Sequence, residues 1–314
     1  MLRCAVLDDY QGVALDLADW SAVQATSFTQ HFTTQDDLVQ AIHEHEIVVV
    51  MRERTPFPAD LFARLPNLRL LVTSGMRNAA IDLDAARGHG VTVCGTAGSS
   101  TPPTELAWAL ILGLARHLVT ESTAMRQNGP WQQTIGLDLC GNTLGLLGLG
   151  KIGSQMAEIG RAFGMDVVAW SRNLTKDRTD LLGIRHAPTL EALLAESDIV
   201  SVHLVLGERS LGLIGERELS LMRRTAYLIN TSRAAIVDQA ALVEALRTGV
   251  IAGAGLDVFD SEPLPPDHPL RTLPNVLATP HLGYVTHANY RTYYQEAVED
   301  IQDFLAGTPI RVLT

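Results

Sequence analysis

Short apolar runs alternate with amphipathic segments along the whole chain. Four such runs fall in the first hundred residues, at 2–7, 47–51, 68–72 and 91–93. A second series follows at 143–148, 166–170, 198–204, 227–231, 254–258 and 276–279. The runs are continuously apolar rather than alternating, which is typical of parallel strands covered by helices on both faces. The pattern therefore predicts an α/β fold with a parallel sheet in each series.

Two longer helical stretches separate and close these series. The first begins at Thr101, which is placed to cap the helix, and two prolines suit its first turn. The second runs from about Thr286 to Ala306. In the simplest arrangement the central block is inserted into the first domain, and the final helix returns to it. We therefore expect one domain from residues 1–99 and 286–314, and another from residues 100–285.

Composition and charge narrow the class of protein. The 314 residues carry a net charge of −11, so no basic surface for nucleic acid or anionic lipid is expected. The longest apolar stretch, 106–115, is about half of a membrane span, and the N-terminus has no signal peptide pattern. The three cysteines, Cys4, Cys94 and Cys140, lack the spacing of a metal or redox site. These features predict a cytoplasmic protein with reduced thiols, without a metal, membrane or nucleic-acid partner.

The strongest local signal is a glycine-rich loop between a strand and an amphipathic helix. Gly148, Gly150 and Gly153 form a GxGxxG motif directly after the run at 143–148. The first glycine permits a tight turn, the second lets the backbone approach a pyrophosphate, and the third lets the helix pack against the sheet. Lys151 and Ile152 lie at the start of that helix, where unpaired N–H groups favour an anion. The loop predicts a dinucleotide-binding site.

The end of the next strand bears on the choice of dinucleotide. An acidic residue about twenty positions after the loop usually holds the adenosine ribose hydroxyls. Here the positions after Trp170 are Ser171, Arg172 and Asn173. With no carboxylate to repel a 2′-phosphate and a guanidinium beside it, NADP is favoured over NAD. The alternative is that Arg172 points to solvent or stacks on adenine while NAD binds through the ribose.

Polar residues follow three later strands, at the sheet edge where ligands bind in open α/β folds. Arg233 follows the run at 227–231, and His281 follows that at 276–279. Asp257 lies at the end of the run between them, and Glu262 lies in the loop beyond it. A carboxylate beside an imidazole stabilises the imidazolium, and an arginine is a natural clamp for a substrate carboxylate. Their joint placement indicates a catalytic group.

These segments together resemble the D-2-hydroxyacid dehydrogenase family. The resemblance rests on GLGKIG, NTSRAAIVD, GLDVFDSEPLP and TPHLGYVT and extends over nearly the whole chain. It implies two doubly wound domains, a Rossmann dinucleotide-binding domain inserted into a flavodoxin-like substrate-binding domain, with cofactor and substrate in the cleft. It also implies a homodimer built on the cofactor domains. The apolar helix at 104–118 is consistent with an interface, although burial within the monomer would give the same pattern.

The family resemblance also implies roles for individual residues. Arg233 would bind the substrate carboxylate and carbonyl, His281 would be the acid/base, and Glu262 would pair with His281. Cofactor contacts are expected from the glycine loop and from residues at the strand ends: Gly148, Gly150, Lys151, Ile152, Gly153, Ser171, Arg172, His203, Thr231 and Asp257. The loop at 74–82 matches the one whose backbone N–H groups grip the substrate carboxylate, which implicates Ser74, Gly75 and Met76.

The substrate is expected to be a small 2-oxo or 2-hydroxy acid, and three arginines bear on its identity. Arg52 and Arg54 follow the run at 47–51, and Arg77 follows the next run. If they faced the cleft, Arg52 above all, they would favour a substrate with a second anionic group. The alternative is that at least two of them form surface ion pairs with Asp or Glu.

Two other functions are compatible with a dinucleotide-binding fold. A non-catalytic protein could sense the dinucleotide and recruit partners, but it would not need Arg233, Glu262 and His281 together. A different Rossmann oxidoreductase, for example one acting on amino acids, would have to explain why His281 follows a strand that ends in Thr-Pro. The combined motifs favour the 2-hydroxyacid dehydrogenase.

Overall fold

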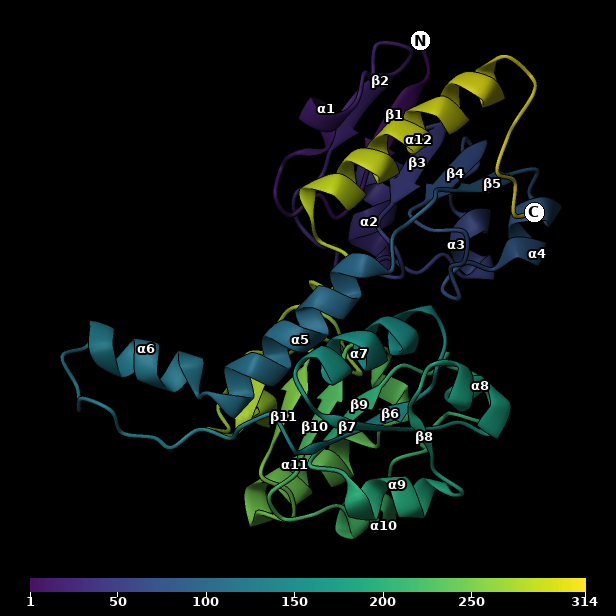
Figure 1. Ribbon diagram of the computed structural model, residues 1–314. Coiled ribbons are helices and arrows are strands. Elements are labelled where there is room, and N and C mark those ends of the chain that lie inside the picture. Colours follow the sequence, from purple (N-terminus) through teal and green to yellow (C-terminus); the bar gives the residue numbers. More distant parts are fainter. The chain divides into compact units, whose positions relative to one another are not determined.

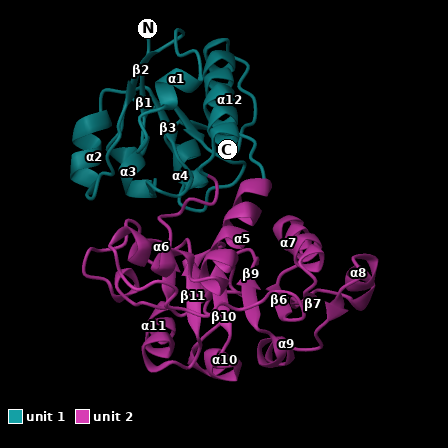
Figure 2. Cartoon of the chain, turned by 60° about the vertical axis from the view of Figure 1, so that its left-hand side comes forward, with its two compact units in different colours: residues 1–99, 285–314 teal, residues 100–284 magenta.

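The computed structural model describes residues 1–314, which divide into two compact units. Unit 1 comprises Met1–Ser99 and Val285–Thr314, and unit 2 comprises Ser100–Tyr284 (Figure 2). The chain therefore leaves unit 1 once and returns to it, so the C-terminal helix belongs to the same unit as the N-terminus. No helix is both long enough and apolar enough to cross a lipid bilayer.

Unit 1 is built on a five-stranded parallel sheet. Its strands are β1 (Arg3–Val6), β2 (Gln24–Ser27), β3 (Ile47–Val50), β4 (Leu70–Thr73) and β5 (Thr92–Gly95). Their order, β2-β1-β3-β4-β5, is the flavodoxin-like order. Its helices are α1 (Ala14–Leu17), α2 (Gln35–Ile42), α3 (Ala59–Ala63), α4 (Leu83–Gly88) and α12 (His287–Leu305). Side chains of α2, α3 and α4 share one apolar cluster with the sheet, and α12 lies on the opposite face (Figure 2).

Unit 2 contains a seven-stranded parallel sheet in the order β12-β11-β10-β9-β6-β7-β8. Counted from β6, this is the Rossmann order with one further strand. The strands are β6 (Thr143–Leu147), β7 (Asp166–Trp170), β8 (Arg185–His186), β9 (Ile199–Val202), β10 (Tyr227–Asn230), β11 (Gly253–Leu256) and β12 (Val276–Ala278). The helices are α5 (Thr101–Ala115), α6 (Leu118–Arg126), α7 (Lys151–Ala162), α8 (Lys176–Leu181), α9 (Leu190–Glu196), α10 (Glu216–Leu221) and α11 (Gln239–Thr248), with 3₁₀ turns η1 (Ala234–Ile236) and η2 (Pro269–Arg271).

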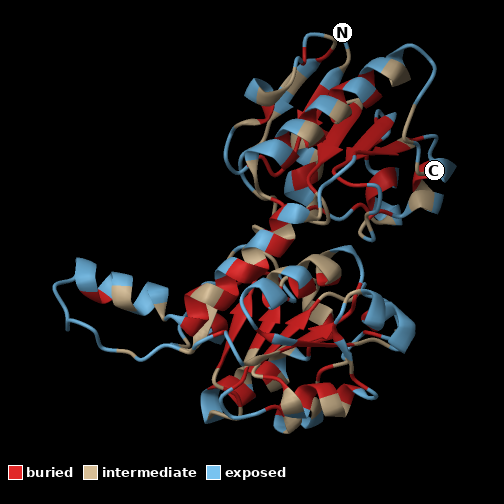
Figure 3. Ribbon diagram, viewed as in Figure 1, coloured by how far each residue is buried: buried red, intermediate tan, exposed pale blue.

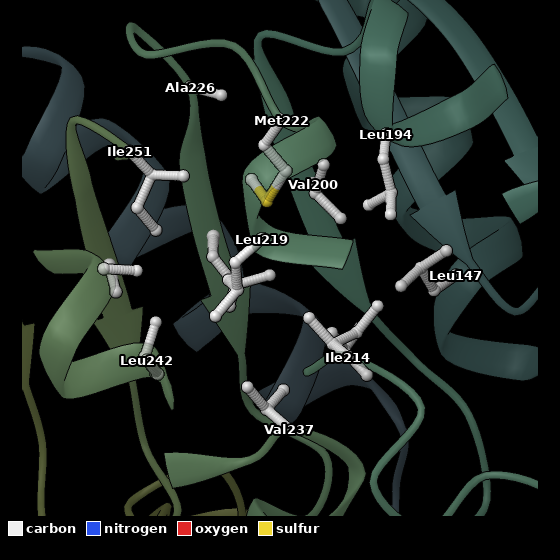
Figure 4. Packing of buried hydrophobic residues seen from close by; sticks show 14 of the residues in the cluster. Leu147, Leu194, Val200, Ile214, Leu219, Met222, Ala226, Val237, Leu242 and Ile251 are labelled. Atoms are coloured by element: carbon white, nitrogen blue, oxygen red, sulfur yellow. The ribbon is translucent and has the colours of Figure 1, made fainter. Parts of the chain in front are cut away.

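Apolar side chains cover both faces of the unit 2 sheet. On one face, Leu147 and Val200 of the sheet share an apolar cluster with Leu219 of α10 and Leu242 of α11 (Figure 4). The other face packs against α5 and α7 through a second cluster that includes Trp108. Each buried leucine contributes about 1.5–3 kcal/mol relative to an exposed one. With both faces covered, the loops at the carboxyl ends of the strands remain as the place for polar residues and ligands.

Each of the ten strands predicted from the apolar runs is present, with ends within two residues. Two strands were not predicted, β2 and β8, and both lie at an edge of their sheet. Their sequences, QATS and RH, are short and polar because an edge strand buries less of its surface. The expected cap at Thr101 is wrong: α5 begins at Thr101, and Ser100 precedes it without a side-chain cap. The prolines of that first turn have no N–H to be capped.

The exposed apolar surface lies beyond α5 rather than on it. Within α5, side chains such as Ile111 and Leu114 are buried in the core of unit 2, so burial explains its apolar pattern. Exposed apolar residues instead occur on α6 and the segment that follows it (Figure 3), namely Leu118, Val119, Met125, Trp131 and Ile135. The side chains of Trp131 and Ile135 are 79% and 94% exposed. Figure 1 shows that α6 projects away from the sheet of unit 2. We call residues 118–135 the arm.

The C-terminal tail is attached to α12 and to the edge of the unit 1 sheet. The N–H of Leu313 donates to the carbonyl of Val93, at 2.7 Å, and that of Gly95 donates to the carbonyl of Arg311, at 3.0 Å. The guanidinium of Arg311 donates to the buried carboxylate of Asp300 in α12, at 2.9 Å. Burial raises the pKa of Asp300 to about 7, although the charge of Arg311 opposes that shift.

This pKa predicts a specific pH dependence of stability. In the unfolded chain the carboxyl titrates near 3.9. Between pH 4 and 7 the folded protein therefore binds more protons at Asp300 than the unfolded chain does, and this contribution to stability is lost as the pH rises through 7. Asp300→Asn removes the dependence. The free energies of unfolding of the variant and the wild type are measured by urea denaturation at pH 5 and at pH 8. The variant's free energy of unfolding minus that of the wild type should be about 2 kcal/mol larger at pH 8 than at pH 5.

The matched control is Glu299→Gln, which removes an exposed carboxylate that accepts from the same arginine. Its stability difference from the wild type should change little over this pH range. Parallel pH curves for the wild type and Asp300→Asn would contradict the assigned pKa.

Candidate active site

The glycine loop has the geometry that close approach of a ligand requires. Gly148 follows β6 with a φ of +102°, a conformation that favours glycine. A Cβ at Gly153 would lie 2.1 Å from the carbonyl oxygen of Gly148, so only glycine allows the first turn of α7 to pack there. A Cβ at Gly150 would meet no atom within 4 Å, which leaves its backbone open. Gly148 and Gly153 therefore pack tightly against the protein backbone, whereas the backbone at Gly150 is accessible to a ligand.

The residues at this loop fit a dinucleotide pyrophosphate. α7 begins at Lys151, and Gly150 precedes it without any side chain that caps the N–H groups of the first turn. A twelve-residue helix presents the positive end of its dipole there, and an anion can accept from the uncapped N–H groups. Lys151 is exposed and Ile152 is partly buried at this end. No group of three or more His, Cys, Asp or Glu side chains is placed to hold a metal ion.

Three neighbouring strands bring the predicted catalytic residues to the same edge of the sheet. β10, β11 and β12 are parallel, and Asn230, Leu256 and Ala278 lie opposite one another at their carboxyl ends. Arg233 follows the first of these positions, and Glu262 and His281 follow the second and third. The side chains of Arg233, Glu262 and His281 are all partly exposed. Polar groups that the sequence separates by up to 48 positions thus emerge from one edge.

His281 and Glu262 form a direct pair. The Nδ1 of His281 lies 2.6 Å from an oxygen of the Glu262 carboxylate, and the other carboxylate oxygen accepts from the N–H of Phe259 at 2.9 Å. The carboxylate accepts at Nδ1 and so favours the Nδ1–H tautomer, which leaves Nε2 to exchange a proton with a ligand. The ring of Tyr284 contacts the imidazole edge-on, with centroids 5.4 Å apart. The imidazole is therefore held from two sides.

Asp257 fixes the loop that carries His281. One oxygen of its buried carboxylate accepts from the hydroxyl of Thr279 and the N–H of Leu282, both at 2.7 Å, and the other accepts from the N–H of Gly283, at 2.8 Å. Burial raises the pKa of Asp257, and these hydrogen bonds oppose the shift. His281 has a φ of +54°, a backbone conformation that costs about 1 kcal/mol for a side chain other than glycine. The three hydrogen bonds hold that conformation in place.

Asn230 was not among the sequence-predicted residues, yet it shapes the loop of Arg233. Its side-chain amide donates to the carbonyl of Arg233 and accepts from the N–H of Ser232, both at 3.0 Å. The Nη1 of Arg233 also donates to the carbonyl of Ser232, at 2.8 Å. Asn230 is buried at the end of β10, where a polar residue closing an apolar strand was the available signal.

The remaining predicted cofactor contacts lie at the same edge of unit 2. Ser171 and Arg172 follow β7, and Thr231 follows β10. His203 follows β9, and its carbonyl oxygen would lie 2.6 Å from a Cβ at Gly148, so it packs directly against the glycine loop. The Nε2 of His203 lies 2.8 Å from the hydroxyl of Ser201. Burial lowers the pKa of His203 to about 4, which keeps this imidazole neutral at pH 7.

In unit 1, the predicted substrate contacts lie at the ends of β3 and β4, which are paired. The Nη1 of Arg52 lies 3.4 Å from the carbonyl oxygen of Ser74 and reaches over Gly75. The N–H of Ser74 donates to Val50 and that of Gly75 donates to the hydroxyl of Thr96, so both are already engaged within unit 1. Met76 is exposed, and its backbone N–H has no partner in the protein.

The three arginines of unit 1 differ in their surroundings. Arg52 lies beside the loop at 74–76 and has its Nε 3.7 Å from the carboxylate of Glu53. Arg54 donates to the carbonyl of Asp8, at 2.9 Å, and its guanidinium lies 4.4 Å from the centre of the Tyr10 ring. Arg77 is exposed. Arg52 and Arg54 therefore turn toward different parts of unit 1.

Comparison with known proteins supports a redox function for this architecture. Residues 108–283 match the family described as D-isomer specific 2-hydroxyacid dehydrogenase, NAD binding domain. A glyoxylate reductase of Aeropyrum pernix is 42% identical over 79% of this chain and 76% of its own. A hydroxypyruvate reductase of Thermotoga maritima is 35% identical, with 87% and 89% covered. The crystal structure of a phosphoglycerate oxidoreductase from Vibrio cholerae has a TM-score of 0.93 and 35% identity, covering 98% of this chain and 100% of that one.

The Rossmann sheet, the glycine loop and the imidazole–carboxylate pair define a nicotinamide dinucleotide-dependent oxidoreductase. The chain belongs to the D-2-hydroxyacid dehydrogenase family. The resemblance inferred from the motifs is thereby confirmed, as are the α/β fold class and the enzymatic function. None of the comparisons supports the alternative of a non-catalytic dinucleotide-sensing protein.

The close packing at the glycine loop predicts the effect of one added methyl group. Gly153→Ala places a Cβ against the carbonyl of Gly148 and forces the loop away from the start of α7. The Kd for a nicotinamide dinucleotide, measured by isothermal titration calorimetry, should rise about tenfold or more, as expected for the loss of a charge-assisted hydrogen bond. Glu158→Ala, at an exposed position of the same helix, is the matched control and should bind normally. Normal binding by Gly153→Ala would contradict the proposed pyrophosphate site.

Proposed function

We propose that this protein interconverts a small 2-oxo acid and the corresponding D-2-hydroxy acid, with His281 as the acid/base. The observation that carries this proposal is the 2.6 Å contact between His281 and Glu262 at the edge of a dinucleotide-binding sheet. A bound nicotinamide dinucleotide supplies or accepts the hydride at the substrate carbon. The residues of the chain then have three tasks: to exchange the hydroxyl proton, to polarise the carbonyl and to hold the carboxylate.

His281 performs the proton transfer in this proposal. In the direction of reduction, its protonated imidazole donates from Nε2 to the carbonyl oxygen of the substrate, because Nδ1 is held by Glu262. The charge of Glu262 stabilises the imidazolium before the transfer, and Asp257 keeps the loop of His281 in place. In the direction of oxidation, the neutral imidazole accepts the same proton.

Arg233 and the loop of unit 1 bind the substrate in this proposal. A guanidinium donates two parallel hydrogen bonds to a carboxylate and also polarises a neighbouring carbonyl oxygen. Arg233 is suited to this because Asn230 fixes its backbone. In unit 1, the guanidinium of Arg52 and the N–H of Met76, a donor with no partner in the protein, supply the carboxylate contacts. The N–H groups of Ser74 and Gly75 donate within unit 1, so these two residues shape the loop that presents Met76.

The substrate is a compact 2-oxo acid such as glyoxylate or hydroxypyruvate in this proposal. Relatives named glyoxylate reductase and hydroxypyruvate reductase support this choice. Of the three arginines that could meet a second anionic group, Arg54 has its guanidinium engaged by the carbonyl of Asp8 and the ring of Tyr10. That engagement favours a substrate with a single carboxylate.

NADP is favoured over NAD as the dinucleotide. The segment after β7 places Arg172 where NAD-binding proteins usually carry an acid for the ribose hydroxyls. The neighbouring side chains, Ser171 and Asn173, add no negative charge. A cytoplasmic location completes the proposal, supported by Cys4, Cys94 and Cys140, all of which are free thiols.

A homodimer formed through the arm is the proposed assembly. The exposed indole of Trp131 and side chain of Ile135 would be costly to leave in water, and apolar patches of this kind mark protein interfaces. The arm belongs to unit 2, so the contact would be built on the dinucleotide-binding unit.

The assignment of His281 predicts a large loss of turnover on its replacement. His281→Asn should lower kcat by about 10²–10⁴-fold, because general acid catalysis typically contributes that factor. Dinucleotide affinity, measured separately by fluorescence titration, should be unchanged. His287→Asn, at an exposed position of α12, is the matched control and should retain activity. Near-normal turnover by His281→Asn would refute the assignment.

The arm predicts the assembly state. A double variant, Trp131→Asp with Ile135→Asp, places two carboxylates in the apolar patch and should convert a dimer into a monomer in sedimentation velocity. Leu181→Asp, which changes a 79% exposed leucine of α8, is the control and should sediment as the wild type does. A wild-type protein that sediments as a monomer would refute this interface.

A further inference from the structure

The end of β7 and the loop after β9 line an open cavity of about 530 Å³ in unit 2. It is lined by Trp170, Ser171, Arg172, Asn173, Leu204, Val205, Leu206, Gly207, Glu208, Arg209, Ser210 and Leu213. β7 and β9 flank β6 in the sheet, so the glycine loop lies between the two walls. The N–H of Gly148 donates to the carbonyl of Trp170, at 2.9 Å, and a Cβ at Gly148 would lie 3.2 Å from the side chain of Leu204. The cavity therefore adjoins the pyrophosphate turn directly.

The charged groups of this cavity favour an anion. Arg172 comes from the end of β7 and Arg209 comes from the loop after β9, so the two guanidiniums enter from different elements. Neither guanidinium forms an ion pair with a carboxylate of the protein. Glu208 also lines the cavity, which leaves one net positive charge. Two arginines beside a pyrophosphate turn suit a further phosphate group, because guanidiniums bind phosphate oxygens in pairs of hydrogen bonds.

The loop of Arg209 is ordered by its own hydrogen bonds. The buried hydroxyl of Ser210 donates to the carbonyl of Val205, at 2.8 Å, and accepts from the N–H of Gly207, at 2.9 Å. The loop is anchored at its ends by Ser232, whose hydroxyl donates to the carbonyl of Leu204, and by Gly212, whose N–H donates to Ala235. Arg209 therefore stands on a fixed turn, and binding a ligand there loses little backbone freedom.

Apolar side chains complete the cavity. Val205 and Leu206 are 80% and 40% exposed, although the carbonyl of Val205 is hydrogen-bonded within the loop. They give the wall after β9 an apolar surface that suits a purine ring, with the arginines at its margin. The combination of an apolar wall, two unpaired guanidiniums and an adjoining pyrophosphate turn matches an adenosine that carries an additional phosphate.

We propose that Arg209, together with Arg172, binds the 2′-phosphate of NADP and that Arg209 is a determinant of cofactor specificity. This inference rests on the proposed function, which makes a nicotinamide dinucleotide the ligand, and it adds a residue from a second loop to the NADP site. Glu208 defines the rival arrangement, in which its carboxylate accepts from the ribose hydroxyls of NAD. The two arrangements predict opposite effects of neutralising Glu208.

The test compares two probes that differ by one phosphate, 2′,5′-ADP and 5′-AMP, by isothermal titration calorimetry. Arg209→Ala should raise the Kd for 2′,5′-ADP about tenfold or more, as for the loss of a charge-assisted hydrogen bond, and leave the Kd for 5′-AMP unchanged. Arg209→Lys should retain part of the affinity, because lysine keeps the positive charge but lacks the paired N–H donors of a guanidinium. Arg224→Ala, at an exposed site outside the cavity, is the matched control. Glu208→Gln should tighten 2′,5′-ADP.

Each outcome decides the proposal. An equal loss of both probes in Arg209→Ala, or no loss of either, overturns the 2′-phosphate assignment. The 2′-phosphate assignment is also overturned if Glu208→Gln weakens the binding of NADH and does not improve the binding of NADPH. That result would favour the arrangement in which Glu208 accepts from the ribose hydroxyls of NAD. Steady-state rates separate this from the proposed function: a wild type that reduces 2-oxo acids with either dinucleotide keeps the dehydrogenase assignment. A wild type that binds neither probe and oxidises neither dinucleotide refutes both.

Discussion

The buried carboxylate of Asp257 is the interaction on which the candidate active site depends. It accepts hydrogen bonds from Thr279, Leu282 and Gly283, on both sides of His281 in the chain. The Asp257 N–H donates to Asn230 in the neighbouring strand, and Asn230 in turn closes the loop of Arg233. One buried acid thus links the ends of three strands. The left-handed backbone of His281 persists because these bonds offset its cost.

The dinucleotide site depends on a different constraint, the close approach of backbone to backbone. Gly148 and Gly153 have no room for a side chain, since the carbonyl groups of His203 and Gly148 lie where a Cβ would be. This packing leaves the uncapped start of α7 facing outward. The cavity at the ends of β7 and β9 continues the same edge. The proposed pyrophosphate and adenosine contacts therefore share one edge, because the strand order β9-β6-β7 places the glycine loop between the ends of β9 and β7.

Much of this could be predicted from the sequence, because parallel strands buried on both faces read as apolar runs and the glycine spacing is specific. The edge strands β2 and β8 could not be predicted in this way, because an edge strand is not required to be apolar. The pairing of His281 with Glu262 was expected from the family resemblance, and the structure shows the contact. The hydrogen bonds of Asp257 to the His281 loop and of Asn230 to the Arg233 loop depend on how side chains meet in space. The order of residues along the sequence does not contain that information. The proposed role of Arg209 could not be predicted from the sequence, because an exposed arginine in a loop is ordinarily a surface residue.

The measurement that tests the central claim most directly is the initial rate of NADPH and NADH oxidation by the purified protein with glyoxylate and hydroxypyruvate. The panel should extend to pyruvate, phenylpyruvate, 2-oxoglutarate and a phosphorylated 2-oxo acid. The account predicts turnover of a compact 2-oxo acid to the D-2-hydroxy acid, faster with NADPH than with NADH. Dinucleotide binding without oxidation in the presence of any of these acids would contradict it.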